Sequence, residues 1–97
     1  KVYPEEVEEA LKLHDSVEDA LVVGVPDDKW GSAVTAVIAL APGATFNEET
    51  LRAHVRAKLA GYKTPKRILT VEEMFRAPNG KADYKQATAF ARSTLGL

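Results

Sequence analysis

The 97-residue sequence contains no cysteine, which excludes disulfide bonds, thiolate metal sites and thiol catalysis. Its two histidines, His14 and His54, lie far apart in the sequence and lack the spacing of metal ligands. We therefore expect both to be ordinary helix or loop residues, and we predict no metal site.

An excess of positive charge is also lacking, because 13 Lys and Arg residues are matched by 14 Asp and Glu residues. Such a balance argues against general binding to nucleic acid or anionic membranes, so no nucleic-acid partner is expected. No apolar run could span a bilayer and no signal-peptide pattern occurs. We expect a cytoplasmic protein and leave peripheral membrane contact of a full-length protein open. Because residue 1 is not methionine, we expect the chain to begin at a cut.

The chain has the length and composition of one domain, with 45% apolar and 28% charged residues. A domain of this size buries roughly 60–65% of the surface that its unfolded chain exposes, which leaves little room for an enclosed pocket. We therefore expect any site to lie at an edge that is shared with another domain.

Apolar periodicity and turn residues predict helices at 4–13, from Asn47 to Gly61, and after Lys81, with Asp83 near the start of the last. Strands are expected at 17–25, 33–41 and 67–71, the first two paired antiparallel. This order predicts an α+β fold, a small three-stranded sheet with helices packed on it. No Gly-x-Gly-x-x-Gly or Gly-x-x-x-x-Gly-Lys-Ser/Thr motif occurs, which excludes Rossmann and P-loop folds.

No chemical role is expected for the charged residues of the helices. Adjacent acids such as Glu8-Glu9 are attributed to the helix macrodipole, and no acid–base role is assigned to them. The exposed face of the second helix is expected to carry Arg52, Arg56 and Lys58.

The segment 76–81, Arg-Ala-Pro-Asn-Gly-Lys, is predicted to form a tight turn with a lysine at its tip. Pro78 restricts its own φ, while Asn79 and Gly80 tolerate the left-handed conformations of a sharp reversal. Lys81 could be a solvated surface residue, the common use of such a turn. Alternatively, its ammonium could hold a carboxylate and a phosphate together and offset the charge that develops as they react.

Two further segments combine aromatic and basic residues. Trp30, the only tryptophan, lies in the connection 26–31, where it could anchor the sheet or offer a flat surface to a nucleotide base. Tyr62, Lys63 and Lys66 lie between the second helix and the third strand, as either a solvated loop or a contact for phosphate or carboxylate groups.

Four segments occur together in the order and approximate spacing of one family: Lys1-Val2-Tyr3-Pro4-Glu5-Glu6-Val7-Glu8, Pro26-Asp27-x-x-Trp30-Gly31, Tyr62-Lys63-x-Pro65-Lys66 and Pro78-Asn79-Gly80-Lys81. Across essentially its whole length, the chain resembles the small C-terminal domain of adenylate-forming enzymes, specifically acyl-CoA synthetases (fatty-acid–CoA ligases). The resemblance implies that residues 1–97 are this single domain, and that the hinge and the ATP-binding N-terminal domain lie before residue 1.

The resemblance implies a ligase that converts a carboxylic acid, ATP and CoA to acyl-CoA, AMP and pyrophosphate. The small domain of the family rotates against its own N-terminal domain between adenylation and thioester formation. Lys81 matches the lysine that bridges the acid and the ATP phosphate, on a turn shaped by Pro78, Asn79 and Gly80. Mg²⁺ would accompany ATP, with ligands in the other domain, and the isolated domain is expected to be inactive.

The resemblance also implies a role in thioester formation for two groups of residues. Tyr3, Pro4 and Glu6 match the segment beside the pantetheine channel, and the positions matched to CoA contacts are Trp30, Tyr62, Lys63 and Lys66. Ser32 and Thr64 depart from residues common in the family, which weakens the CoA assignment more than the ligase assignment. Two alternatives remain: an adenylate-forming ligase that does not use CoA, and a non-catalytic α+β module that docks a protein partner.

Overall fold

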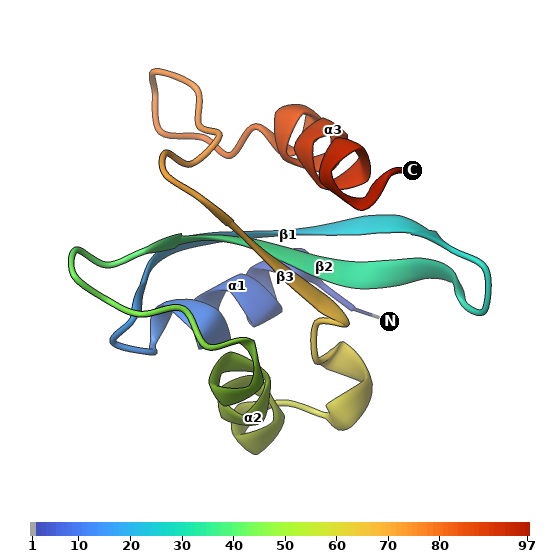
Figure 1. Ribbon diagram of the computed structural model, residues 1–97, viewed down its shortest axis with the longest axis horizontal. Helices are drawn as coiled ribbons and strands as arrows, with labels where there is room; N and C mark the ends of the chain where they lie inside the picture. Colours follow the sequence, from blue (N-terminus) through green and yellow to red (C-terminus); the bar gives the residue numbers. More distant parts are fainter. Residues whose placement is uncertain (1) are drawn as a thin grey trace.

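The computed structural model describes residues 2–97 and shows a three-stranded sheet between two layers of helices (Figure 1). Helices α1 (Pro4–Lys12) and α2 (Glu48–Lys58) cover one face of the sheet, and α3 (Tyr84–Leu95) covers the other. The predicted α+β fold is confirmed.

The sheet has the order β1-β2-β3, with β2 (Gly31–Leu40) in the centre. Strand β1 (Val17–Asp27) pairs antiparallel with β2, as predicted, and β3 (Arg67–Val71) pairs parallel with β2. A central strand is covered on both faces, which explains the long apolar run in β2. The first two strands extend further into their connection than expected, with Asp27 opposite Gly31, so Trp30 lies at the tip of the hairpin.

Alternation along the strands divides the core between the two faces. The core between the sheet and the helices α1 and α2 consists of the buried residues Val7, Leu11, Val17, Ala20, Val22, Ala36, Ile38, Leu51, Val55 and Ile68. The core between the sheet and α3 consists of Leu21, Val23, Val25, Ala33, Ala87 and Ala91. The two alanines of α3 are fully buried, because a small side chain lets the helix backbone approach the sheet closely.

The ends of the helices follow from capping residues. Asn47 accepts a hydrogen bond from the Thr50 N–H at the start of α2, and Asp83 accepts one from the Gln86 N–H at the start of α3. The expected end of the second helix at Gly61 is wrong, since α2 ends at Lys58 and residues Gly61–Lys63 form a separate 3₁₀ turn.

The two histidines, which are far apart in the sequence, lie against each other where α1 meets α2. Their ring centroids are 5.0 Å apart in an edge-to-face arrangement, because the folded helices bring distant positions together. His54 Nε2 lies 2.7 Å from the Ala10 carbonyl oxygen, and His14 Nδ1 accepts a hydrogen bond from the Ser16 N–H. Within residues 2–97 no group of three potential metal ligands occurs, and no helix there is long and apolar enough to cross a membrane.

Candidate functional site

The turn before α3 holds Lys81 through main-chain and side-chain hydrogen bonds on both sides. The Gly80 N–H donates to the Ala77 carbonyl at 2.8 Å, and the Ala77 N–H donates to the Lys81 carbonyl at 2.9 Å. Gly80 adopts the left-handed conformation expected of it, with φ of 86°. Asn79 does not, and instead its side-chain oxygen accepts the Lys81 N–H at 3.1 Å. The backbone of Lys81 is therefore well defined.

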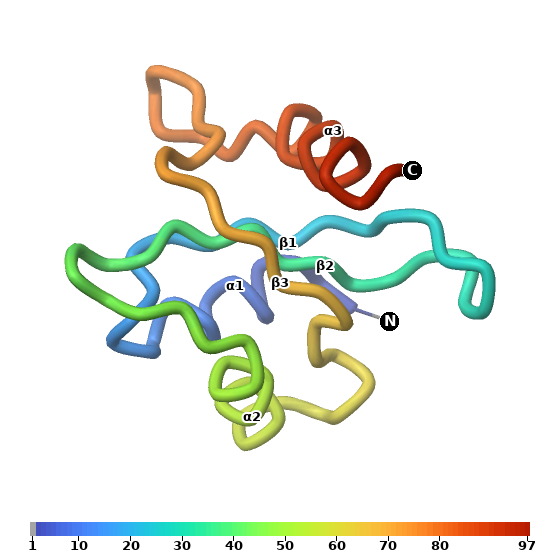
Figure 2. Tube along the Cα trace, in the orientation of Figure 1, coloured from blue at the N-terminus to red at the C-terminus, as the bar shows by residue number. Residues whose placement is uncertain are grey.

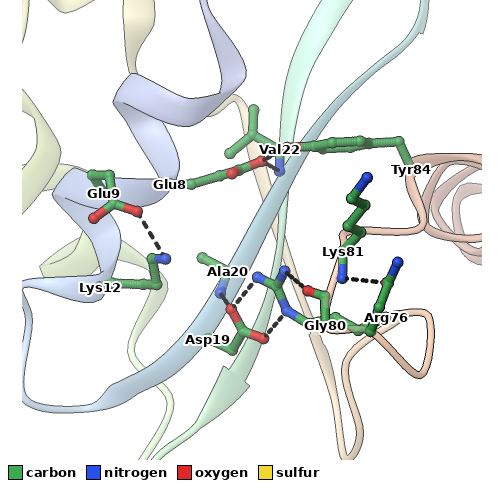
Figure 3. A network of polar contacts seen from close by, with 11 residues as sticks. Glu8, Glu9, Lys12, Asp19, Ala20, Val22, Arg76, Gly80, Lys81 and Tyr84 are labelled. Atoms are coloured by element: carbon green, nitrogen blue, oxygen red, sulfur yellow. Dashed lines mark hydrogen bonds and ion pairs between the residues drawn. The ribbon is translucent and has the colours of Figure 1, made fainter.

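The side chain of Lys81 is exposed and extends from this turn (Figure 3). Among the described residues, its ammonium has no hydrogen-bond or ion-pair partner. An unpaired cation on an ordered backbone is available to an anionic group that comes from outside the domain.

Arg76 ties the same turn to the edge of the sheet. Its Nε and Nη2 atoms donate to the two carboxylate oxygens of Asp19 on β1, each at 2.8 Å, and its Nη1 donates to the Gly80 carbonyl at 2.9 Å (Figure 3). Asp19 Oδ1 also accepts the Ala20 N–H at 2.8 Å. The Arg76 guanidinium lowers the pKa of Asp19, chiefly through the hydrogen bonds, so the carboxylate stays ionised.

Glu8 links the two helical layers past the same edge of the sheet. This α1 residue is 6% exposed, and its Oε2 accepts the Val22 N–H of β1 at 2.9 Å and the Tyr84 hydroxyl of α3 at 2.8 Å. Burial, together with the hydrogen-bonded Glu8 carboxylate, raises the pKa of Tyr84. The macrodipole explanation is therefore insufficient for Glu8. Its spacing of three from buried Leu11 was the signal that it faces inward.

An open groove of about 580 Å³ lies beside the hairpin tip, and its lining includes Val34, which packs against the core under α1 and α2. Its lining includes Trp30, Tyr62 and Lys66, three of the four residues predicted to contact CoA. Trp30 is 70% exposed and Tyr62 is 64% exposed, so neither ring is buried in the core of the domain. These two rings present open aromatic surface to a ligand.

The fourth predicted residue, Lys63, does not line this groove. Its ammonium contacts the Glu6 carboxylate of α1 at 2.7 Å, and this hydrogen bond raises the pKa of Lys63. Lys66 lines the groove while its ammonium contacts the Asp27 carboxylate at 2.9 Å, which lowers the pKa of Asp27. Both cations therefore have partners that an incoming phosphate would have to share or displace.

A second hollow of about 270 Å³ continues the groove towards α1 and includes Pro4 and Gly24 in its lining. The two hollows share Val2, Ser32 and Val34, so Pro4 lies on the same surface as the groove. Tyr3 is 57% exposed and lines neither hollow.

Arg52 holds the loop that carries Lys66. Its guanidinium donates to the carbonyls of Pro65, at 3.1 Å, and Lys66, at 2.6 Å, and it also contacts Glu48 and Glu49. The side chain is only 18% exposed, so its expected place on the exposed face of α2 is wrong. Sequence alone could not show this, because the acceptors lie 13 and 14 residues away.

The family model of the AMP-binding enzyme C-terminal domain matches residues 6–81, from α1 to the lysine of the turn. A curated relative, the 3-oxocholest-4-en-26-oate–CoA ligase of Rhodococcus rhodochrous, is 53% identical over 90% of this chain. The chain belongs to the AMP-binding enzyme C-terminal domain family.

Other relatives show the same similarity, and the chain spans only part of their length. The medium/long-chain-fatty-acid–CoA/3-oxocholest-4-en-26-oate–CoA ligase of Mycobacterium tuberculosis is 52% identical over 90% of the chain. The domain spans only 16% of the length of each of these two ligases.

Solved structures of AMP-binding enzymes contain the same fold. An acyl-CoA synthetase of Brucella canis matches 95% of this chain with 34% identity and a TM-score of 0.87, and the match covers 18% of that chain. The amide bond synthetase McbA of Marinactinospora thermotolerans matches 92% with 39% identity and the same TM-score, again over 18% of that chain. The fold of this C-terminal domain therefore occurs in enzymes with different acceptors.

The Lys81 turn and the groove lie on separate parts of the domain. In Figure 2 the orange turn before α3 and the blue-green hairpin tip beside the groove lie on opposite sides of the molecule. The turn leads into α3, whereas Trp30 and Tyr62 line the groove together with Val34, which packs against the core under α1 and α2.

Proposed function

We propose that residues 1–97 are the C-terminal domain of an ATP-dependent acid–CoA ligase and that Lys81 serves its adenylation step. The observation that carries this proposal is the unpaired Lys81 ammonium on an ordered turn, in a chain 53% identical to a CoA ligase. The hinge and the ATP-binding domain belong to the remainder of that enzyme, which we place in the cytoplasm.

In the adenylation step, a carboxylate oxygen of the acid bonds to the α-phosphorus of ATP. The bond from that phosphorus to the bridging oxygen breaks, and pyrophosphate leaves with the electron pair. The Lys81 ammonium would hold both anions and offset the charge that develops on the phosphoryl oxygens. One charge pair at about 4 Å contributes about 4 kcal/mol at an effective dielectric of 20, before desolvation, and about 1.4 kcal/mol corresponds to tenfold in rate.

In the second step, the CoA sulfur bonds to the acyl carbon and its thiol proton passes to solvent. The bond from that carbon to the phosphate oxygen breaks, and AMP leaves with the electron pair. We assign CoA to the groove, with Trp30 and Tyr62 against the adenine and Lys66 near its phosphates. Tyr3, Pro4 and Glu6 would border the pantetheine arm, and Lys63 would act mainly by holding Glu6. The separation of this groove from Lys81 supports a rotation of the domain between the two steps.

The substrate class follows from the relatives, whose names include fatty-acid–CoA and 3-oxocholest-4-en-26-oate–CoA ligases. We propose a fatty or related apolar carboxylic acid, bound by the N-terminal domain together with ATP and its Mg²⁺. Retained dependence on CoA would distinguish this function from that of an adenylate-forming enzyme with another acceptor.

The test compares the full-length enzyme with its Lys81→Ala variant in carboxylate-dependent exchange between ATP and pyrophosphate. We expect exchange to fall about 10³-fold, in line with the charge-pair energy above, while thioester formation from supplied acyl-adenylate and CoA largely survives. Lys85→Ala, which removes another exposed lysine four positions along the chain, is the matched control and should leave both rates unchanged. Normal exchange in Lys81→Ala would overturn the assignment of Lys81 to adenylation. If the wild-type enzyme forms no thioester from acyl-adenylate and CoA, the proposed role of CoA is overturned.

A further inference from the structure

The ion pair between Arg76 and Asp19 joins the Lys81 turn to β1. Neither residue takes part directly in the proposed reaction. We propose that this pair positions Lys81 for adenylation by fixing the turn against the sheet. The inference rests on the proposed role of Lys81. In it, Arg76 acts through the turn and does not touch the substrate.

The geometry uses the whole guanidinium group. Three of its nitrogens donate at once, two to the Asp19 carboxylate and one to the carbonyl of Gly80, the residue directly before Lys81. A bidentate pair of this kind restricts orientation as well as distance. A lysine at position 76 would keep the charge but lose the planar fork that reaches all three oxygens.

The residues that flank the turn, Phe75 and Ala82, pack against the core under α3 and hold the base of the turn. The other hydrogen bonds of the turn are local. They join Ala77 to Gly80 and Lys81, and Asn79 to Lys81, all within the segment 76–81. These bonds give the turn its shape. The contact to Asp19, which is 57 residues away in the sequence, adds a hydrogen-bonded tie from Arg76, at the start of the turn, to the edge of the sheet.

Asp19 is itself held in place. Its Oδ1 accepts the Ala20 N–H, and the register of β1 against β2 shifts between Val17 and Asp19. Such bulges redirect side chains at the edge of a sheet. The carboxylate therefore offers Arg76 a fixed docking point, with 21% of its side chain exposed.

A pair that served only the stability of the domain would have a different signature. Partly exposed ion pairs contribute little to stability, so their loss should leave catalytic rates unchanged. Loss of a positioning pair should instead lower the turnover number of adenylation, since small displacements of a reacting group reduce rate steeply. The affinity for ATP, which the other domain binds, should change little.

The experiment uses the full-length enzyme with Arg76→Lys, Arg76→Ala and Asp19→Asn. In ATP–pyrophosphate exchange we expect kcat to fall about 10- to 100-fold in each, with KM for ATP changed by less than about threefold. Thioester formation from supplied acyl-adenylate should stay within about twofold of wild type. Arg56→Ala removes an exposed arginine of α2 and should leave every rate unchanged.

Hydrogen exchange of peptides that cover residues 76–82 provides a readout independent of turnover. Protection there should fall in Asp19→Asn and Arg76→Lys, which retain size closely enough to keep the fold, and stay unchanged in Arg56→Ala. If Lys81→Ala loses adenylation while the Arg76 and Asp19 variants keep wild-type kcat, the positioning role is overturned and the function of Lys81 stands. If Lys81→Ala adenylates normally, both proposals fail.

Discussion

The hydrogen bond between Tyr84 and buried Glu8 should be a measurable part of the stability of this domain. Tyr84→Phe removes the hydroxyl that donates to Glu8 Oε2 at 2.8 Å and leaves the ring in place. A hydrogen bond to a charged group contributes about 1.5–3 kcal/mol. Because Tyr84 is partly exposed, we expect the lower end, about 1.5 kcal/mol, from a total of about 5–15 kcal/mol for a domain of this size.

Urea unfolding of the 97-residue chain, followed by circular dichroism, measures this loss directly. In thermal unfolding, a loss of about 1 kcal/mol lowers the melting temperature by about 4–8 °C, so the melting temperature of Tyr84→Phe should fall by roughly 6–12 °C. Tyr62→Phe is the matched control, since its ring is 64% exposed, and it should change stability by less than about 0.5 kcal/mol. In a double-mutant cycle with Glu8→Gln, the two residues should show a coupling of about 1 kcal/mol.

The pH dependence gives a second test of the same contact. The pKa of Tyr84 is raised because burial and the Glu8 carboxylate both favour the neutral phenol. The contribution to stability is therefore complete below the unfolded pKa of about 10 and is lost as pH rises through and beyond it. Wild type should lose more stability than Tyr84→Phe above about pH 10. The reasoning would be refuted if the effects of Tyr84→Phe and Glu8→Gln on the free energy of unfolding were additive. Equal stabilities of Tyr84→Phe and Tyr62→Phe would also refute it.

Three further predictions concern the edge of the sheet and the groove. Arg76 lowers the pKa of Asp19, so this stabilisation should be present above about pH 4 and disappear as pH falls further, and Asp19→Asn should show a shallower decline in acid unfolding followed by fluorescence. A Cβ on Gly24 would lie 2.6 Å from the Ser32 hydroxyl oxygen, which can rotate away, so Gly24→Ala should cost less than about 1 kcal/mol in urea unfolding, and a cost above about 2 kcal/mol would contradict this. In the full-length enzyme, Trp30→Ala should raise KM for CoA about tenfold, in line with base stacking of about 1–3 kcal/mol, and leave ATP–pyrophosphate exchange unchanged; an unaltered KM would exclude stacking.

The local structure was predictable wherever it depends on neighbouring residues. Asn47 and Asp83 cap their helices, and Gly80 adopts its left-handed turn, because each acts on a backbone within a few positions. The two apolar runs and the short connection between them, at 26–31, predicted the antiparallel pair of β1 and β2. The predicted end of α2 was wrong because the leucine and alanine before Gly61 give no signal that a helix ends.

The candidate site was predictable in its residues but not in its organisation. Pattern and resemblance selected Lys81, Trp30, Tyr62 and Lys66, and the last three do line one groove. Lys63 was expected beside them, yet it pairs with Glu6, 57 residues away in the sequence.

The sequence by itself determined the fold class, the helices and strands, and the turn that carries Lys81, because period, capping and turn chemistry act over short distances. Only the tertiary structure decided which charges meet. Arg76 binds Asp19 on β1, and Glu8 joins β1 to Tyr84. Both contacts form because β1 is an edge strand, whose polar groups are accessible to residues from either side of the sheet. The same packing separates Lys81 from the groove, because the turn leads into α3 while the groove lies beside the hairpin tip.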